Sequence, residues 1–225
     1  MNNLSERLLS LAEFTERGSA VCDVGTDHGY LPAFLYLSGE YKSVCATDIR
    51  VQPLKNARAN LKRLGADGVR LLLCDGLKDV TRDMADNVII AGMGGEVISG
   101  IIDRAAFVRD SSVLLILQPM TAARELREYL AREGFKVECE KAVHENNKVY
   151  SIMKARFTGD SYTLDSTRAV IGLLTPTDDA AREYIKKQYN IAFKCCCDLE
   201  KVTAKREEYL EYKALAENLK SILED

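Results

Sequence analysis

The sequence predicts an α/β fold in which helices cover a mostly parallel sheet. Short apolar runs alternate with amphipathic segments over the first 133 residues, which is the order expected of β-α-β units. Each of four successive apolar runs has an acidic residue or a glycine at its carboxyl end. In a parallel sheet these ends are expected at one edge. Residues 177–225 contain no Pro or Gly and predict a helical appendage.

The expected elements follow one another regularly. An amphipathic helix is expected over Asn3–Glu16, because leucines recur there every three or four residues and Gly18 lies beyond its end. Strands are expected near residues 20–24, 44–48, 69–74, 87–91 and 113–117. Helices are expected near residues 31–38, 52–64, 94–103 and 121–133. Two further strands, 136–143 and 148–157, are expected to form a closing hairpin through the polar residues 144–147.

A polar stretch with a glycine, Thr158–Ser161, marks the expected boundary between a first domain, 1–160, and a helical tail, 161–225. In the tail, apolar residues recur at spacings of 3, 4 and 7, the pattern of a coiled-coil seam. The seam residues are Tyr184, Ile185, Ala192, Leu199, Val202, Tyr212, Leu215, Leu219 and Ile222. The phase changes after Val202, which favours a bend near Thr203–Glu208 and an antiparallel helical pair. A single helix packed on the sheet is the alternative.

The most informative segment is Cys22–Pro32, which joins the first expected strand to a helix. Dinucleotide sites read G-x-G-x-x-G, because bare backbone N–H groups and a helix N-terminus must meet a pyrophosphate. Here Asp23 closes the strand and Asp27 lies in the turn, where a pyrophosphate would have to sit. Two carboxylates suit S-adenosylmethionine better, since its methionine end carries an ammonium and a sulfonium. Taken alone, the segment also fits a strand, turn and helix without a ligand.

The next three strand ends strengthen the ligand interpretation. Asp48 ends the second strand 23 residues beyond Gly25, and an acid about 20 residues after the glycine turn is where ribose hydroxyls are usually held. Asp75-Gly76 ends the third strand, and Gly92-Met93-Gly94-Gly95 follows the fourth. The four strand ends together indicate a cofactor site much more specifically than any one of them does.

These motifs resemble those of class I S-adenosylmethionine-dependent methyltransferases. More narrowly, the chain resembles the bacterial TrmK family, tRNA (adenine-N1)-methyltransferases acting on adenosine 22. The narrower resemblance is carried by Asp23–Pro32, Asp75–Leu77, Ala91–Gly95 and Leu117–Pro119. It covers Leu4 to Phe157 and extends more weakly to the helical tail. It implies a Rossmann-like sheet of seven strands with one antiparallel strand, which five strand-helix alternations and a hairpin suit.

The resemblance implies S-adenosylmethionine as cofactor and tRNA as partner. The residues expected to bind the cofactor are Asp23, Gly25, Thr26, Asp27, His28, Gly29, Asp48, Ile49, Asp75, Gly76, Ala91, Gly92, Met93 and Gly94. Two departures from the general class pattern matter. Asp27 replaces the middle glycine of D-x-G-x-G-x-G, and no Asn/Asp-Pro-Pro-aromatic motif follows the fourth strand. That motif accompanies methylation of exocyclic amino groups, so its absence leaves a ring nitrogen, an oxygen or a carbon as acceptor.

Asp27, His28 and Tyr30 are the expected catalytic residues, because they lie at the mouth of the first turn. Adenine N1 is a neutral nucleophile that needs no general base, but the base must be unpaired or flipped to react. Asp27 could accept from the base amino group or hold the cofactor ammonium. His28 could bond the cofactor carboxylate or the base, and Tyr30 could stack on adenine. The alternative is that His28 and Tyr30 only pack the turn.

Two other polar residues are weaker candidates. His144, in the hairpin loop, is expected to be structural or to contact the substrate. Gln118, expected just after the fifth strand, could read a base edge, or Gln118-Pro119 could be a plain turn.

The composition, 47% hydrophobic and 29% charged, is ordinary for a globular domain, and no run is long enough to span a membrane. Met1–Ser10 lacks the basic end and apolar block of a signal peptide, so a cytoplasmic protein is expected. Three of the seven cysteines, Cys22, Cys45 and Cys74, are expected inside buried strands, as in a reducing compartment. There is no C-x-x-C pair, and Cys195–Cys197 on a helix cannot converge on one ion, so no metal is expected.

The net charge of −3 argues against a nucleic-acid ligand, since phosphate neutralisation supplies most of such affinity. Electropositive surface would have to come from local clusters. The cations that recur after the second strand or near strand ends are Arg50, Lys55, Arg58, Lys62, Arg63, Arg104, Arg109, Arg124 and Arg127. For most of them a solvated helix face is the simpler interpretation.

Other functions remain compatible with the residues. The chain could be a small-molecule methyltransferase whose tail is a dimer seam, or a non-catalytic adaptor that presents a coiled coil. A nicotinamide-dependent oxidoreductase is disfavoured by the acidic turn. The oligomeric state stays open.

Overall fold

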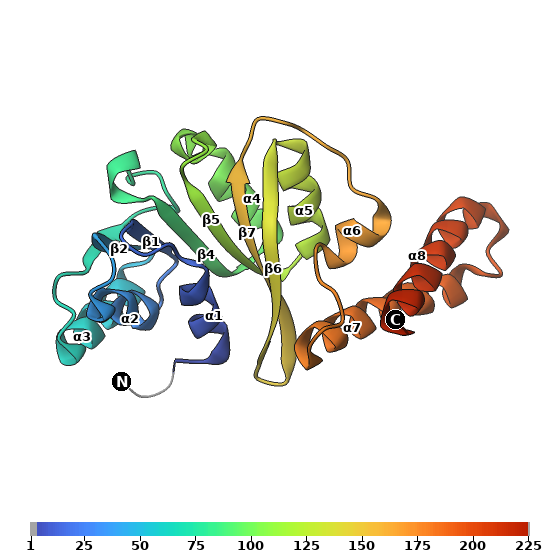
Figure 1. Ribbon diagram of the computed structural model, residues 1–225, viewed down its shortest axis with the longest axis horizontal. Helices are drawn as coiled ribbons and strands as arrows, with labels where there is room; N and C mark the ends of the chain where they lie inside the picture. Colours follow the sequence, from blue (N-terminus) through green and yellow to red (C-terminus); the bar gives the residue numbers. More distant parts are fainter. Residues whose placement is uncertain (1–3, 225) are drawn as a thin grey trace.

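The computed structural model describes residues 4–224. Seven strands form one sheet in the order β3-β2-β1-β4-β5-β7-β6 (Figure 1). The strands are β1 (Ala20–Val24), β2 (Ser43–Asp48), β3 (Arg70–Leu73), β4 (Asn87–Gly94), β5 (Leu114–Thr121), β6 (Phe135–Glu145) and β7 (Lys148–Phe157). All neighbours pair in parallel except β7, which runs antiparallel to β5 and to β6. The expected mostly parallel sheet with one antiparallel strand is confirmed.

Helices lie on both faces of this sheet. They are α1 (Glu6–Phe14), α2 (Tyr30–Ser38), α3 (Val51–Leu64), α4 (Gly95–Asp103), α5 (Ala123–Arg132), α6 (Ser166–Ile171), α7 (Asp179–Leu199) and α8 (Arg206–Glu224). Short 3-10 turns span Arg82–Met84, Ala106–Arg109 and Thr203–Lys205. Adjacent residues of β4 show the two layers: Ile89 packs with α1, α2 and α3, whereas Ile90 packs with α4 and α5. This continuous burial on both faces explains why the strands read as unbroken apolar runs.

The ends of β4 and β5 differ from the expectation. Both strands run three or four residues further than the sequence predicts, and they stay paired through irregular registers at Ala91, Met93 and Gly94. Gly92-Met93-Gly94 is therefore a bulged strand end, and Gln118 lies inside β5 instead of after it. Cys74 is buried as expected but lies one residue beyond β3. Bulges depend on the partner strand, so periodicity along one segment does not reveal them.

The tail is a helical pair, as expected, with α7 and α8 connected through residues 200–205. Tyr184, Ile185, Leu215 and Leu219 are buried in its core together with Ala142 and Val149 of the β6-β7 hairpin. Val202, expected in the seam, is instead exposed in the connection between the helices. The short helix α6, which the sequence does not predict, packs against the same core. The tail thus shares buried surface with the sheet.

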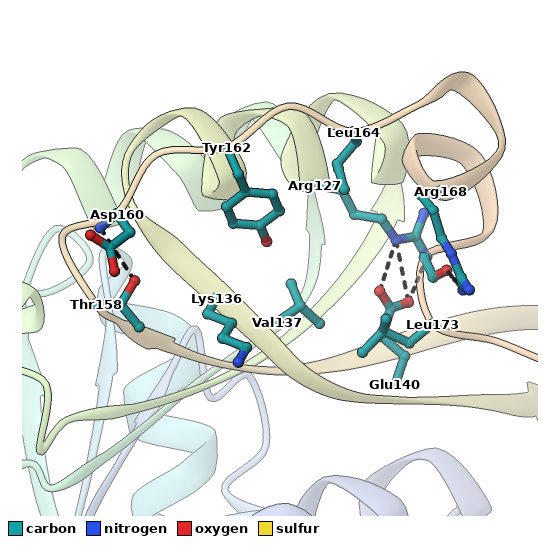
Figure 2. A pocket seen from close by; sticks show the side chains of 11 residues that line it. Arg127, Lys136, Val137, Glu140, Thr158, Asp160, Tyr162, Leu164, Arg168 and Leu173 are labelled. Carbon is teal, nitrogen blue, oxygen red and sulfur yellow. Dashed lines mark hydrogen bonds and ion pairs between the residues drawn. The ribbon is translucent and has the colours of Figure 1, made fainter.

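Arg127 of α5 is a buried ion-pair partner and not a surface cation, which corrects one member of the basic set. Its side chain and that of Glu140 in β6 are each 1% exposed, and Arg127 Nη2 lies 2.8 Å from Glu140 Oε2. Arg127 Nη1 also donates to the carbonyl oxygens of Ala169 and Val170 in α6. Figure 2 shows the pair beside a cavity of about 430 Å³ between α5, β6 and the segment leading to α6. The pair joins the sheet to the first helix of the tail.

Arg127→Ala is expected to lower the free energy of unfolding by about 3–5 kcal/mol, because it leaves the Glu140 carboxylate buried without its cation. The matched control is Arg124→Ala on the exposed side of α5, whose pair with Glu128 is worth less than about 1 kcal/mol. Urea unfolding measures both variants. The double variant Arg127→Met with Glu140→Leu should recover most of the loss. Similar, small losses for Arg127→Ala and Arg124→Ala would contradict the structural role.

Candidate cofactor and active site

The turn between β1 and α2 is held open by two glycines and tied to β2. Gly25 has a φ of +80°, a backbone conformation that other residues rarely adopt, and the end of the Met93 side chain lies where a Cβ would be. Gly29 has a φ of +70° and lies so close to α3 that a Cβ would meet Ala57 at 3.1 Å. The amides of Gly25 and Thr26 both donate to the Thr47 carbonyl at the end of β2. These constraints explain why the turn needs glycine at both positions.

This turn lines a cavity of about 280 Å³ at the carboxyl edge of the sheet. The cavity brings together residues from α1, from the β1-α2 turn and from the end of β4. They are Arg7, Leu8, Asp23, Gly25, Thr26, Asp27, His28, Gly29, Tyr30, Leu31, Ala91 and Gly92. The three expected catalytic residues and most of the expected cofactor residues therefore share one cavity.

Asp23 is the buried anion of the cavity. Burial raises the pKa of its carboxyl group from 3.8 to about 6, although the Thr26 hydroxyl and the Arg7 guanidinium oppose the rise. The Thr26 hydroxyl is itself buried and lies close enough to the carboxylate to lower its pKa, but it makes no hydrogen bond of regular geometry within residues 4–224. A buried carboxylate and a buried hydroxyl without a regular hydrogen bond are both costly unless something binds them. The pair therefore fits a polar, cationic ligand group.

Arg7 of α1 is a cavity residue that the sequence reasoning missed. Its Nε donates to Glu145 Oε2 at 2.5 Å and its Nη1 donates to Gln118 Oε1 at 3.0 Å. Gln118 Oε1 also accepts from the Gly92 amide at 3.1 Å, and the side chain is fully buried. The Gln118 side-chain oxygen thus fixes Arg7 and the bulged end of β4, and a contact of this amide with a base edge stays a prediction. These partners lie more than 100 residues from Arg7, so no local pattern points to it.

The remaining expected cofactor residues lie outside this cavity, on the neighbouring strand ends. Asp48, whose side chain is 6% exposed, accepts from the Arg50 amide at 2.8 Å, and Ile49 beside it is exposed. Gly76 accepts from the Thr47 hydroxyl through its carbonyl. Asp75 is exposed and lies 3.6 Å from Arg104. Because β2 and β3 follow β1 in the sheet, these groups continue the same edge beyond the cavity.

Asp27, His28 and Tyr30 form the outer rim of the cavity. Asp27 Oδ2 lies 3.3 Å from His28 Nε2, and both side chains are more than half exposed. The ring centroids of His28 and Tyr30 are 5.7 Å apart with a tilt of 31°. Two exposed rings at the mouth of a cavity offer a surface on which a planar base could stack. By contrast, His144 lies away from this rim, with Nε2 2.9 Å from Glu183 Oε2 of α7.

Two properties of the described part of the chain bear on other classes of function. Within residues 4–224, no cluster of three or more His, Cys, Asp or Glu side chains is arranged to hold a metal ion. No helix in that range combines the length and the apolarity needed to cross a bilayer.

Comparisons with known proteins agree on one family. A model of the methyltransferase-domain family matches residues 4–153. The tRNA (adenine(22)-N(1))-methyltransferase of Bacillus subtilis (strain 168) is 30% identical over 172 residues, which is 76% of this chain and 72% of the relative.

Solved structures match over nearly the whole chain. The crystal structure of the tRNA methyltransferase TrmK of B. subtilis superposes with a TM-score of 0.84 at 25% identity, covering 98% of this chain and 99% of that one. A Streptococcus pneumoniae protein crystallised in complex with S-adenosyl-L-methionine superposes with a TM-score of 0.79 at 27% identity, covering 95% and 100%. The chain therefore belongs to the methyltransferase-domain family and, within it, to the TrmK family of tRNA (adenine-N1)-methyltransferases.

Proposed function

We propose that this chain transfers a methyl group from S-adenosylmethionine to N1 of adenosine 22 in tRNA. The observation that carries the proposal is the cavity itself, which holds a buried carboxylate and an arginine in its lining and presents two aromatic rings at its mouth. The B. subtilis relative is named for the same reaction. A pyrophosphate does not suit a cavity that places Asp23 and Asp27 around the turn.

The cavity residues divide between the charged groups of the cofactor. Asp23 is placed to attract the ammonium, with Asp27 nearby, and the Thr26 hydroxyl is free to accept from it. Arg7 is placed to attract the carboxylate. Asp48 would hold the ribose hydroxyls, because it is the acid at the end of the adjacent strand. The other expected contacts are His28, Gly25, Gly29, Ile49, Asp75, Gly76, Ala91, Gly92, Met93 and Gly94.

When bound, the cofactor supplies an electrophilic methyl group for in-line displacement. The chain's own contribution is orientation, because adenine N1 already carries a lone pair and needs no general base. Tyr30 and His28 are placed to stack the flipped base at the rim. Methylation leaves the base cationic, and the Asp27 carboxylate is placed to stabilise that charge and to accept from the amino group.

The tail is assigned to tRNA capture. Lys186, Lys187 and Lys194 are exposed along α7 and can follow a phosphate backbone. The boundary at residue 160 stays a proposal, and α6 beyond it accepts hydrogen bonds from Arg127 of the sheet layer. A tRNA substrate and the absence of disulfides among the described cysteines fit a cytoplasmic protein.

Loss of the gene is expected to remove 1-methyladenosine at position 22 from cellular tRNA. Mass analysis of tRNA nucleosides, with mapping of the position, measures this. Wild-type protein should restore the modification, whereas Asp27→Ala and Tyr30→Ala should not, because both side chains lie at the mouth of the cavity. Tyr36→Phe, at the other end of α2, is the folded control. Unchanged tRNA without the gene would overturn the proposed function. Full activity of both variants would move the catalytic role to Gln118 or to residues 144–147.

Asp48→Ala is expected to weaken S-adenosylmethionine binding by on the order of 2 kcal/mol or more, because two charge-assisted hydrogen bonds to the ribose are removed. Isothermal calorimetry measures the affinity. Asp67→Ala, an exposed acid just past the other end of α3, is the matched control and should bind normally. Equal affinities for the two variants would remove Asp48 from the ribose site.

Affinity for S-adenosylmethionine is expected to fall as the pH drops through about 6, because Asp23 then takes up a proton and no longer attracts the ammonium. The loss should approach about tenfold for each pH unit below that point. Titrations from pH 5 to pH 8 test this. An affinity that stays constant over this range would contradict the assignment of Asp23.

The same pKa makes a prediction about stability. The pKa of folded Asp23 lies above the ordinary 3.8, so the cost of burying this carboxyl group in the cofactor-free fold builds up as the pH rises from 3.8 to about 6 and is complete above that. Asp23→Asn is therefore expected to bind the cofactor poorly while raising the free energy of unfolding at pH 7.5 by on the order of 1–3 kcal/mol. Urea unfolding of the cofactor-free proteins at pH 7.5 measures the difference, and a less stable Asp23→Asn variant would contradict it.

A further inference from the structure

The exposed side of α3 is the most one-sided charged surface next to the candidate site. Residues 49–66 contain five basic residues and no acid. They are Arg50, Lys55, Arg58, Lys62 and Arg63. This local excess stands in a chain whose net charge is −3.

The helix presents these cations to solvent. Its buried side chains are Pro53, Ala57 and Leu61; Leu61 packs in the core beside the sheet and Ala57 packs against Gly29. Lys55, Arg58 and Lys62 follow one another at spacings of three and four residues, so they form a row along the opposite side. Lys55 and Lys62 are two turns apart, about 10 Å along the helix axis. Such a row can follow successive phosphates of a nucleic-acid strand.

The positive charges of this row are not neutralised by acids on α3. Lys55, Arg58, Lys62 and Arg63 make no ion pair with any acid of residues 4–224. Some other exposed helix cations pair within their own helix, as in Arg124–Glu128 of α5 and in Lys213–Glu217 and Lys220–Glu224 of α8. Like charges at helical spacings of three and four repel and destabilise a helix slightly. An ordinary solvated face, with both signs interspersed, does not describe α3.

The row also adjoins the rim of the cavity. Asn60 of α3 donates to the carbonyl oxygen of His28 at 3.0 Å, and Ala57 packs against Gly29. In Figure 1, α3 lies at one end of the long axis of the molecule, and α7 and α8 lie at the other. A polyanion that contacts both ends must therefore cross the sheet between them. The orientation of α3 relative to His28 is fixed by these contacts.

We propose that the exposed side of α3, formed by Lys55, Arg58 and Lys62, binds the phosphate backbone of the substrate RNA beside the reacting nucleotide. This inference rests on the proposed function and adds a second RNA-binding surface, on the methyltransferase fold itself, to the one assigned to the tail. Backbone contacts of this kind position the substrate without reading its sequence. The surface therefore sets affinity and placement, and the rim residues act on the base.

The test compares the full-length wild-type chain with the triple variant Lys55→Gln, Arg58→Gln, Lys62→Gln. The triple variant is expected to bind tRNA about tenfold more weakly, or worse, at low salt, because neutralised phosphates supply most of the affinity. The slope of log affinity against log salt concentration should fall by about 1 for each phosphate that no longer meets a cation. The KM for tRNA should rise while kcat at saturating tRNA and the affinity for S-adenosylmethionine stay unchanged. The charge-preserving variant Lys55→Arg, Lys62→Arg should bind like the wild type.

The matched control is Arg17→Gln, Lys42→Gln, Lys136→Gln. These three exposed cations lie at or before the amino-terminal ends of β1, β2 and β6, at the sheet edge opposite the cavity. The control removes the same net charge and should leave tRNA affinity within about twofold of wild type. Equal affinity and salt slope for the α3 variant and wild type would overturn the inference while wild-type methylation of tRNA leaves the proposed function standing. A wild-type chain that does not methylate tRNA would instead overturn the proposed function.

Discussion

The buried carboxylate of Asp23 is the constraint around which the cavity is arranged. Burial raises the pKa of this carboxyl group to about 6, so an ionised Asp23 needs positive charge nearby or a cationic ligand. The fold supplies positive charge through Arg7, which reaches the cavity from α1. Arg7 in turn needs Glu145 and Gln118 to hold it, and Gln118 holds the bulged end of β4. The contacts that hold Arg7 near the Asp23 carboxylate thus connect α1, β1, β4, β5 and β6.

The sequence predicts well what is locally encoded. Apolar runs that end in acids or glycines predict the strands β1 to β4, a fifth apolar run predicts β5, and the break in the seam predicts the bend between α7 and α8. The failures involve distant partners. Gln118 looked like a turn residue because the pairing that extends β5 lies on β4, and Arg127 looked like a surface cation because Glu140 is on β6. Arg7 was missed for the same reason, since its partners lie in the second half of the chain.

A net charge of −3 and an RNA substrate are compatible because the charges are segregated. The field that a phosphate meets depends on groups within about one Debye length, roughly 10 Å at moderate salt, and not on the total. Along α3 that neighbourhood contains a row of cations and no acid of the same helix. On α8, acids alternate with lysines and compensate them. A net charge counted over the whole chain, or over the tail, averages the basic surface of α3 with surfaces of mixed charge. The total therefore does not reveal the row of cations on α3.

The shape of the molecule adds a physical reason for two RNA-binding surfaces. Each surface alone meets only a few phosphates through screened interactions, which are weak at physiological salt. When one end of a folded RNA is bound at the tail, the other end is held at a high effective concentration near α3, so the second contact forms as an intramolecular step. The two proposed surfaces together would place the intervening nucleotide over the proposed rim of Asp27, His28 and Tyr30. A base that must leave its stack to react is then presented where two exposed rings can replace its former stacking partners.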